Sequence, residues 1–126
     1  MKKIIILSIS IILSFISVAS AEVMHINCKF NEGWHQKGTI RADVKKMPDL
    51  SISLDKQKRI IKSTDRIFEP YNTFNDSFHW SHKWTGWKDD YTLNTINGNL
   101  VVTGFNKKEN WENSFYYTCD KIQKKF

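Results

Sequence analysis

The densest group of chemically active side chains in this sequence lies in one segment, residues 78–91. It contains three tryptophans, two histidines and an acidic pair. A histidine within hydrogen-bond reach of a carboxylate can act as a general base, so the segment allows a small hydrolase as an alternative function. The residues concerned are His79, His82, Asp89 and Asp90. Alternating aromatic residues are also typical of a half-buried strand, and acidic residues usually lie in solvent. We therefore assign no catalytic residue.

The histidines predict no metal site. His79 and His82 are three residues apart, so on an extended strand their side chains point to opposite faces. His25 and His35 could join them only through the tertiary fold, and no cysteine–histidine pair has the close spacing of a zinc motif. We expect no metal and no cofactor.

Three tryptophans that fall outside the regular alternation are candidate binding residues. Trp34 and Trp87 each follow a glycine, and Trp111 lies within the polar segment 106–113, so all three are predicted in loops. Exposed indole rings are usually avoided unless they pack or bind. Tyr71, in a predicted loop over residues 65–75, is a fourth candidate and could cover a barrel interior. The partners that suit such rings are an envelope glycan, a secreted protein or a small apolar molecule.

The first 21 residues have the layout of a secretory signal peptide. A basic start at Lys2 and Lys3 precedes an apolar run over residues 4–18 and the small residues 19–21. The apolar run is too short to span a bilayer as a helix. We therefore expect residues 1–21 to be removed, and residues 22–126 to form one exported domain with no transmembrane anchor, in the periplasm or the medium.

The net charge of the chain gives little information about a binding partner. The loss of two lysines with residues 1–21 lowers the formal net charge from +6 to +4, and the remaining basic residues are spread along the chain. A mild, dispersed charge is typical of solvated loop tips. Nucleic acid is not expected as a partner in the predicted compartment.

Cys28 and Cys119 are the only cysteines in the sequence and lie near opposite ends of the predicted domain. In an oxidising compartment an isolated pair favours a disulfide over free thiols or an intermolecular bond. Such a bond closes a loop of about 92 residues, which in the chain-entropy model contributes roughly 4–5 kcal/mol.

Alternation of apolar and polar residues with period two runs through most of residues 23–120, and no segment has helical periodicity. Strands are expected over residues 23–30, 37–46, 50–55, 60–61, 78–85, 91–96, 99–105 and 115–120. Turns are expected at residues 31–33 and 56–59, and the loop over residues 65–75 has room for one helical turn at 65–68.

The clearest hairpin is centred on Asn97-Gly98, the strongest two-residue turn signal. Folding about this pair places Leu93 opposite Val102. The apolar face of the hairpin then consists of Tyr91, Leu93, Leu100 and Val102. Register and apolar pattern agree, which supports the pairing.

Serial strands without crossover helices imply antiparallel pairing. The sequence therefore predicts an all-β fold, a single antiparallel meander of about eight strands closing into a small barrel, with a β-sandwich as the alternative. Residues 93–100 together with Tyr117-Thr118-Cys119 resemble the C-terminal hairpin and cysteine strand of small exported bacterial β proteins of uncharacterised type. That resemblance implies a β fold and export, and no activity.

The function that these observations favour is a non-enzymatic exported protein that binds through aromatic-bearing loops. Three alternatives remain open: a barrel that binds a small apolar ligand, a small secreted hydrolase, and an inhibitor of a secreted enzyme. An enzyme requires a histidine close to a carboxylate inside a cleft, whereas an inhibitor requires a rigid protruding loop.

Overall fold

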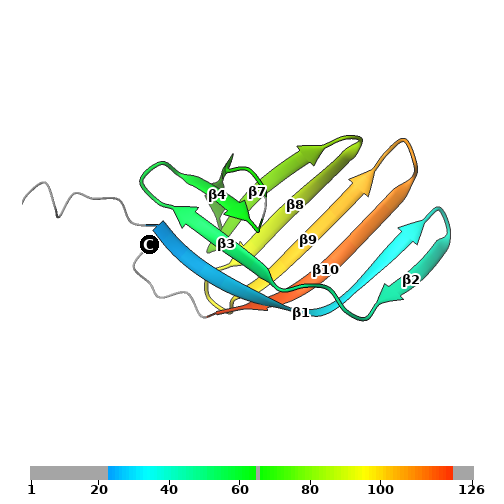
Figure 1. Cartoon of the computed structure of the whole chain (residues 1–126), viewed down its shortest axis with the longest axis horizontal. Coiled ribbons are helices and arrows are strands. Elements are labelled where there is room, and N and C mark those ends of the chain that lie inside the picture. The colour runs from blue at the N-terminus through cyan, green and yellow to red at the C-terminus, as the bar shows by residue number, and fades with distance from the viewer. Residues whose placement is uncertain (1–22, 65, 121–126) are drawn as a thin grey trace, which may run out of the picture.

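The computed structural model describes residues 23–64 and 66–120, which form one strongly curved antiparallel sheet without a helix (Figure 1). The predicted signal peptide, residues 1–21, lies outside the described residues. The strands are β1 (Val23–Lys37), β2 (Ile40–Val44), β3 (Leu50–Asp55), β4 (Ile60–Ser63), β5 (Glu69–Pro70), β6 (Asn72–Phe74), β7 (Ser77–Trp84), β8 (Trp87–Asn94), β9 (Asn99–Asn106) and β10 (Trp111–Cys119).

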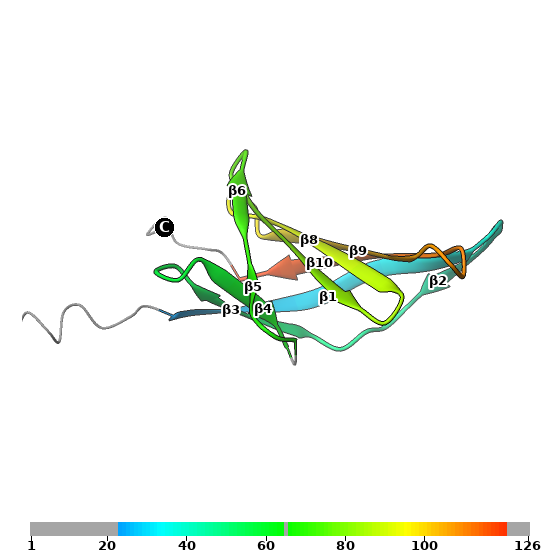
Figure 2. The same cartoon turned by 90° about the horizontal axis from the view of Figure 1, so that it is seen from above.

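The sheet follows the order β5-β4-β3-β1-β10-β9-β8-β7-β6, with β2 attached to β1 alone. The first and last strands are therefore neighbours in the middle of the sheet, and its two ends are β5 and β6. Figure 2 shows how the sheet curls so that these ends approach each other, and β5 lies against β7. The predicted meander is confirmed as an antiparallel sheet that nearly closes into a barrel.

Side chains join the two ends of the sheet. His82 Nδ1 on β7 lies 3.0 Å from Glu69 Oε1 on β5. Next to this contact, the Arg66 guanidinium lies 3.5 Å from the Asp89 carboxylate of β8. Closure therefore depends on polar side-chain pairs where a backbone ladder is missing.

The hydrophobic core fills one end of the nearly closed barrel. Trp80 stacks on Tyr91 with ring centroids 4.9 Å apart, and both side chains are buried. The other buried apolar residues are Ile26, Cys28, Ile52, Leu54, Ile61, Tyr71, Phe78, Leu93, Leu100, Val102, Tyr117 and Cys119. All strands from β1 to β10 except β2, β5 and β6 contribute to this core.

The turn predicted at residues 31–33 is wrong. β1 continues through it as a 15-residue strand, and the register against β10 shifts between Phe30 and Glu32. The additional residue, Asn31, forms a β-bulge, which lets one strand keep its partner while its side chains change faces. Before the bulge even-numbered residues such as Cys28 face inward, and after it Gly33 lies opposite inward-facing Phe115.

The hairpin register predicted around Asn97-Gly98 is also wrong, by two residues. Leu93 pairs with Leu100 instead of Val102. The Asn94 Oδ1 atom accepts hydrogen bonds from the backbone N–H groups of Ile96 and Asn97, at 2.8 and 3.1 Å, which widens the turn. Because side chains alternate with period two, a shift by two leaves the predicted apolar face buried.

The predicted loop over residues 65–75 contains the short strands β5 and β6. No helical turn occurs at residues 66–68, the described part of the predicted segment. Pro70 belongs to β5, a two-residue strand at one end of the sheet, where the missing backbone N–H removes no ladder bond.

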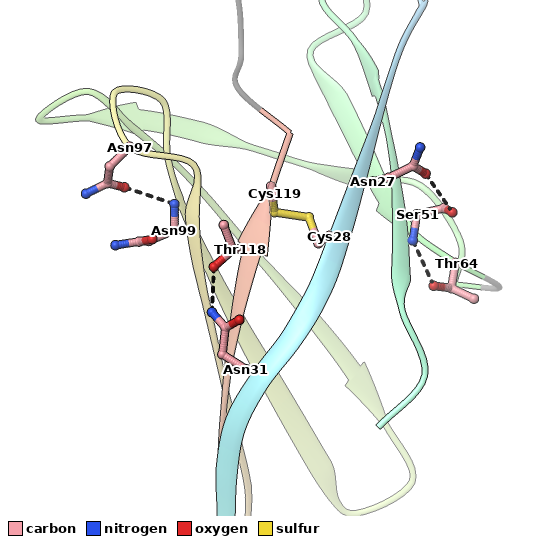
Figure 3. The surroundings of a disulfide bond; sticks show 9 residues. All are labelled: Asn27, Cys28, Asn31, Ser51, Thr64, Asn97, Asn99, Thr118 and Cys119. Carbon is pink, nitrogen blue, oxygen red and sulfur yellow. Dashed lines mark hydrogen bonds between the residues drawn. A yellow bond between two sulfur atoms is a disulfide. The ribbon is translucent and has the colours of Figure 1, made fainter. Parts of the chain in front are cut away.

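Cys28 and Cys119 form a disulfide between directly opposite residues of β1 and β10 (Figure 3). Backbone hydrogen bonds from Cys119 N to Gly98 O and from Asp120 N to Asn27 O hold the same end of β10, at 2.8 and 2.9 Å. A disulfide-bonded pair is compatible with an exported protein. Within residues 23–64 and 66–120, no helix is long and apolar enough to cross a membrane.

Candidate functional site

The inner face of the sheet continues beyond the core toward the tips of three hairpins. In Figure 1 the β7–β8, β9–β10 and β1–β2 tips point to the same end of the molecule. The cross-strand register places Trp84 opposite Trp87, Asp89 opposite Gly104, and Asn113 opposite both Gly104 and His35. This half of the inner face has no layer of core side chains over it, because the strands extend past β3 and β4.

Three tryptophans form a continuous row across this open half, which we call the tryptophan row: Trp84, Trp87 and Trp111. Trp84 stacks on Trp87 with centroids 5.8 Å apart and an interplanar angle of 12°, and Trp87 meets Trp111 edge-on at 6.2 Å. A cation lies over the ring at each end, Arg66 at 5.2 Å from Trp84 and Lys37 at 5.3 Å from Trp111. The rings therefore support one another.

Hydrogen bonds fix the orientation of two of these rings. Trp84 Nε1 donates to Asp89 Oδ2 at 3.0 Å, and Trp111 Nε1 donates to Asn113 Oδ1 at 3.1 Å. The same Asn113 oxygen is bonded to His35 Nδ1. The row is therefore preorganised, and its apolar surfaces are held toward the interior of the open half.

A cleft of about 410 Å³ lies on the inner face beside the tryptophan row, with which it shares Arg66 and Asp89. Its floor is the inner face of β8, β9 and β10, represented by Tyr91, Val102, Phe115 and Tyr117. Its walls are the connection between β2 and β3 with the first residue of β3, and the last residue of β4 with the segment that follows it. The residues of these walls are Met47, Pro48, Asp49, Leu50, Ser63, Thr64 and Arg66. Arg66 and Asp89 border both the cleft and the tryptophan row.

Two buried phenols supply the polar groups of the cleft floor. Burial raises the pKa of Tyr91 above its ordinary value, and a hydrogen bond to Ser63 opposes that effect. Burial, together with the nearby Tyr91 and Asp49, raises the pKa of Tyr117 to about 12. Both phenols are therefore neutral at physiological pH and able to donate hydrogen bonds.

The predicted binding residues do not gather in one place. Trp87 and Trp111 lie together in the tryptophan row. Trp34 lies on the outer face, where the Arg41 guanidinium covers its ring at 4.6 Å. Tyr71 is 7% exposed and packs against Phe78 in the core.

The predicted loop positions of the three tryptophans are also wrong. Trp34 lies within β1, Trp87 is the first residue of β8, and Trp111 is the first residue of β10. The strands continue toward the hairpin tips beyond the last residues that alternate between apolar and polar, and they include the three tryptophans.

The hydrolase candidates are distributed over both faces. His79 contacts Thr92 at 3.2 Å, and Asp90 accepts a hydrogen bond from Ser81. On the inner face, Asp89 is engaged by Trp84 and Arg66, whereas His82 pairs with Glu69, which the sequence did not suggest. Among the described residues, no group of three potential ligands is placed to hold a metal ion.

Sequence reasoning missed several residues of the cleft and of the tryptophan row. Trp84 was not among the candidates; it is 43% exposed at the end of β7, next to the hairpin tip. Nothing in the sequence marked Arg66, whose role depends on the curl that brings it to β8. The apolar alternation predicted Tyr91 on the buried face of a hairpin, but nothing in the sequence indicated a cleft that Tyr91 and Tyr117 line together.

No family model, curated protein or solved structure matches this chain. Function therefore has to be argued from the geometry of the cleft and the tryptophan row. The resemblance of residues 93–100 and 117–119 to small exported β proteins stays a prediction.

Proposed function

We propose that this is an exported, non-enzymatic binding protein that holds a small ligand with an apolar body in the inner cleft. The observation that carries the proposal is the 410 Å³ cleft with its aromatic and apolar floor, which Arg66 and Asp89 connect to the tryptophan row. A cleft of this size suits a small molecule, because ligand sites typically enclose about 300–1,000 Å³.

The lining indicates how such a ligand would lie. Val102, Phe115 and Leu50 offer apolar surface, while the phenols of Tyr91 and Tyr117 offer hydrogen bonds at the floor. A few polar groups among apolar walls are typical of sites that orient a mainly apolar molecule. A ligand with one hydroxyl or carbonyl group would satisfy this pattern.

The tryptophan row favours a ligand in the cleft over a glycan stacked on an open surface. Stacking on a sugar needs a free ring face. Arg66 lies over the Trp84 ring and Lys37 over the Trp111 ring, and the Trp87 ring lies between these two tryptophans. The row instead contacts Arg66 and Asp89, two residues that line the cleft. A secreted protein partner would need a protruding surface, whereas Tyr91, Phe115 and Tyr117 line a concavity.

A binding role also agrees better with the acidic residues than hydrolysis does. Asp89 is held by Trp84 and Arg66, and the histidine–carboxylate pair His82–Glu69 joins the ends of the sheet. These contacts hold neighbouring parts of the sheet together. The His82–Glu69 atoms are within hydrogen-bond distance at 3.0 Å, but neither residue lines the inner cleft, so this cleft does not support the hydrolase alternative.

The binding proposal is tested with a neutral, fluorescent apolar probe, N-phenyl-1-naphthylamine, titrated into the oxidised protein. We expect saturable binding with about one site per chain, and at least roughly tenfold weaker binding for Trp87→Ala, which removes the centre of the row. Trp34→Ala is the matched control, because that ring lies on the outer face. Absence of saturable binding, or equal weakening by both substitutions, would contradict the proposal.

Export is part of the proposal and has its own test. The Cys28–Cys119 bond and the apolar leader over residues 4–18 support it. The full chain expressed in a bacterium should appear outside the cytoplasm with its N-terminus at residue 22. A full-length cytoplasmic product with reduced cysteines would refute export and leave the binding test unaffected.

A further inference from the structure

The free edge of β2 differs from the other two free edges of the sheet. β5 and β6 are two and three residues long, and β5 contains Pro70. Short strands and proline are the usual protection of an edge against pairing with another chain. β2 has five residues without proline or lysine, four of them exposed, and in the described part of the chain it pairs with β1 alone.

The hairpin between β1 and β2 determines which backbone groups face this edge. Lys37 pairs with Ile40 across the two-residue turn that contains Gly38, so these residues form a hydrogen-bonded pair. The backbone groups of alternate residues then point the other way. Arg41 and Asp43 consequently direct their N–H and C=O groups toward the free edge.

We propose that β2 pairs antiparallel with β2 of a second copy of this chain and forms a symmetric dimer. Hydrogen-bonded pairing of Arg41 and Asp43 with the same residues of the second copy allows three registers, centred on residues 41, 42 and 43. The outer registers place two arginines or two aspartates directly opposite each other, which is destabilising. The register centred on Ala42 places Arg41 opposite Asp43 twice.

The side chains of β2 fit the central register. Arg41 and Asp43 are exposed, and neither takes part in a salt bridge within residues 23–64 and 66–120. On the inner face, Ile40 is 76% exposed and would lie opposite Val44 of the second copy. Self-pairing therefore neutralises two charges per chain and covers an isolated apolar side chain, which a partner of unrelated sequence would not do.

Charge reversal tests the dimer. Analytical ultracentrifugation over a range of protein concentrations should show a monomer–dimer equilibrium for the oxidised wild-type protein. Arg41→Asp and Asp43→Arg should each weaken association at least about tenfold, because each creates like-charge pairs. The double variant R41D/D43R should restore it. Arg41 also covers the Trp34 ring at 4.6 Å, so Arg41→Asp removes this packing as well, whereas Asp43→Arg leaves Arg41 in place.

Cysteine cross-linking tests the register. In the central register the Cα atoms of the two Ala42 residues are about 4.5 Å apart, within disulfide range. Ala42→Cys should therefore give a covalent dimer under mild oxidation, whereas Arg41→Cys and Asp43→Cys should not. A monomeric wild-type protein at all concentrations, a dimer indifferent to both charge reversals, or cross-linking through position 41 or 43 would each overturn the proposal.

Discussion

Two glycines with similar backbone conformations but different surroundings allow a matched test of the packing at the end of β10. Gly98 has φ +75° and Gly38 has φ +62°, so alanine is strained at both positions. A Cβ atom at Gly98 would lie 2.7 Å from the backbone oxygen of Cys119, whereas at Gly38 the nearest heavy atom is Asn110 Nδ2 at 3.9 Å. Only Gly98→Ala therefore meets rigid backbone.

The expected losses follow from these distances. The left-handed conformation costs alanine about 1 kcal/mol at either position. At Gly98 the turn must also move away from β10, which strains the packing by about 1–2 kcal/mol. This movement weakens the hydrogen bond from Cys119 N to Gly98 O, now 2.8 Å, by up to about 1 kcal/mol. Gly98→Ala should therefore lower the free energy of unfolding by about 3 kcal/mol, and Gly38→Ala by about 1 kcal/mol.

Equilibrium urea unfolding of the oxidised protein, followed by circular dichroism, measures both values. The effect of alanine on the unfolded chain is the same for the two variants and cancels in their difference. Equal losses for Gly98→Ala and Gly38→Ala would refute the close contact between the β8–β9 turn and the end of β10.

Three further predictions concern stability. Because the pKa of Tyr117 is about 12 in the folded protein against an ordinary value of 10.0, its stabilising contribution is complete below pH 10 and disappears between pH 10 and 12. The free energy of unfolding, measured between pH 10 and 12, should therefore fall by about 2–3 kcal/mol less in Tyr117→Phe than in the wild type. Tyr116→Phe, which changes a tyrosine on the outer face, is the control and should behave as the wild type does. Reduction of the Cys28–Cys119 bond should lower the free energy of unfolding by roughly 4–5 kcal/mol, and an unchanged urea midpoint would contradict this. Asn94→Ala removes the acceptor of two backbone hydrogen bonds and should lower the free energy of unfolding by about 1–2 kcal/mol. Coinciding denaturation curves of variant and wild type would contradict this prediction.

The inward and outward faces of the strands could be predicted from the sequence, because burial on one side of a sheet requires period-two alternation. Tyr91, Leu93, Leu100 and Val102 are buried as expected. The pairing of Cys28 with Cys119 could be predicted from the cysteine count and the expected compartment, without knowledge of the fold. These features depend on residue type and spacing alone.

Registers and strand ends could not be predicted, because they depend on side-chain contacts between distant residues. The Asn94 side chain widens a turn that the Asn97-Gly98 pair alone would make tight. The bulge at Asn31 lets β1 continue where a turn was expected. Neither the wider turn nor the bulge changes the pattern of apolar residues, so neither can be predicted from that pattern.

The cleft was the least predictable feature. It forms where the curled sheet brings Arg66 to Asp89 and the connection before β3 over Tyr117. Trp87 and Trp111 were predicted as binding residues, but their position beside Trp84, across two hairpins, depends on the sheet order. Curvature is a property of the whole sheet, and single segments carry no sign of it.

The central position of β1 has a consequence for the time at which this protein can fold. β1 is the first described strand to be synthesised and contacts three others, and its longest ladder is with β10, the last. The hairpins of β7 to β10 can form from neighbouring residues, but contacts between distant segments form slowly. The edge of β1 that pairs with β10 therefore has no partner until β10 has been made. The sheet cannot close until synthesis has passed Cys119.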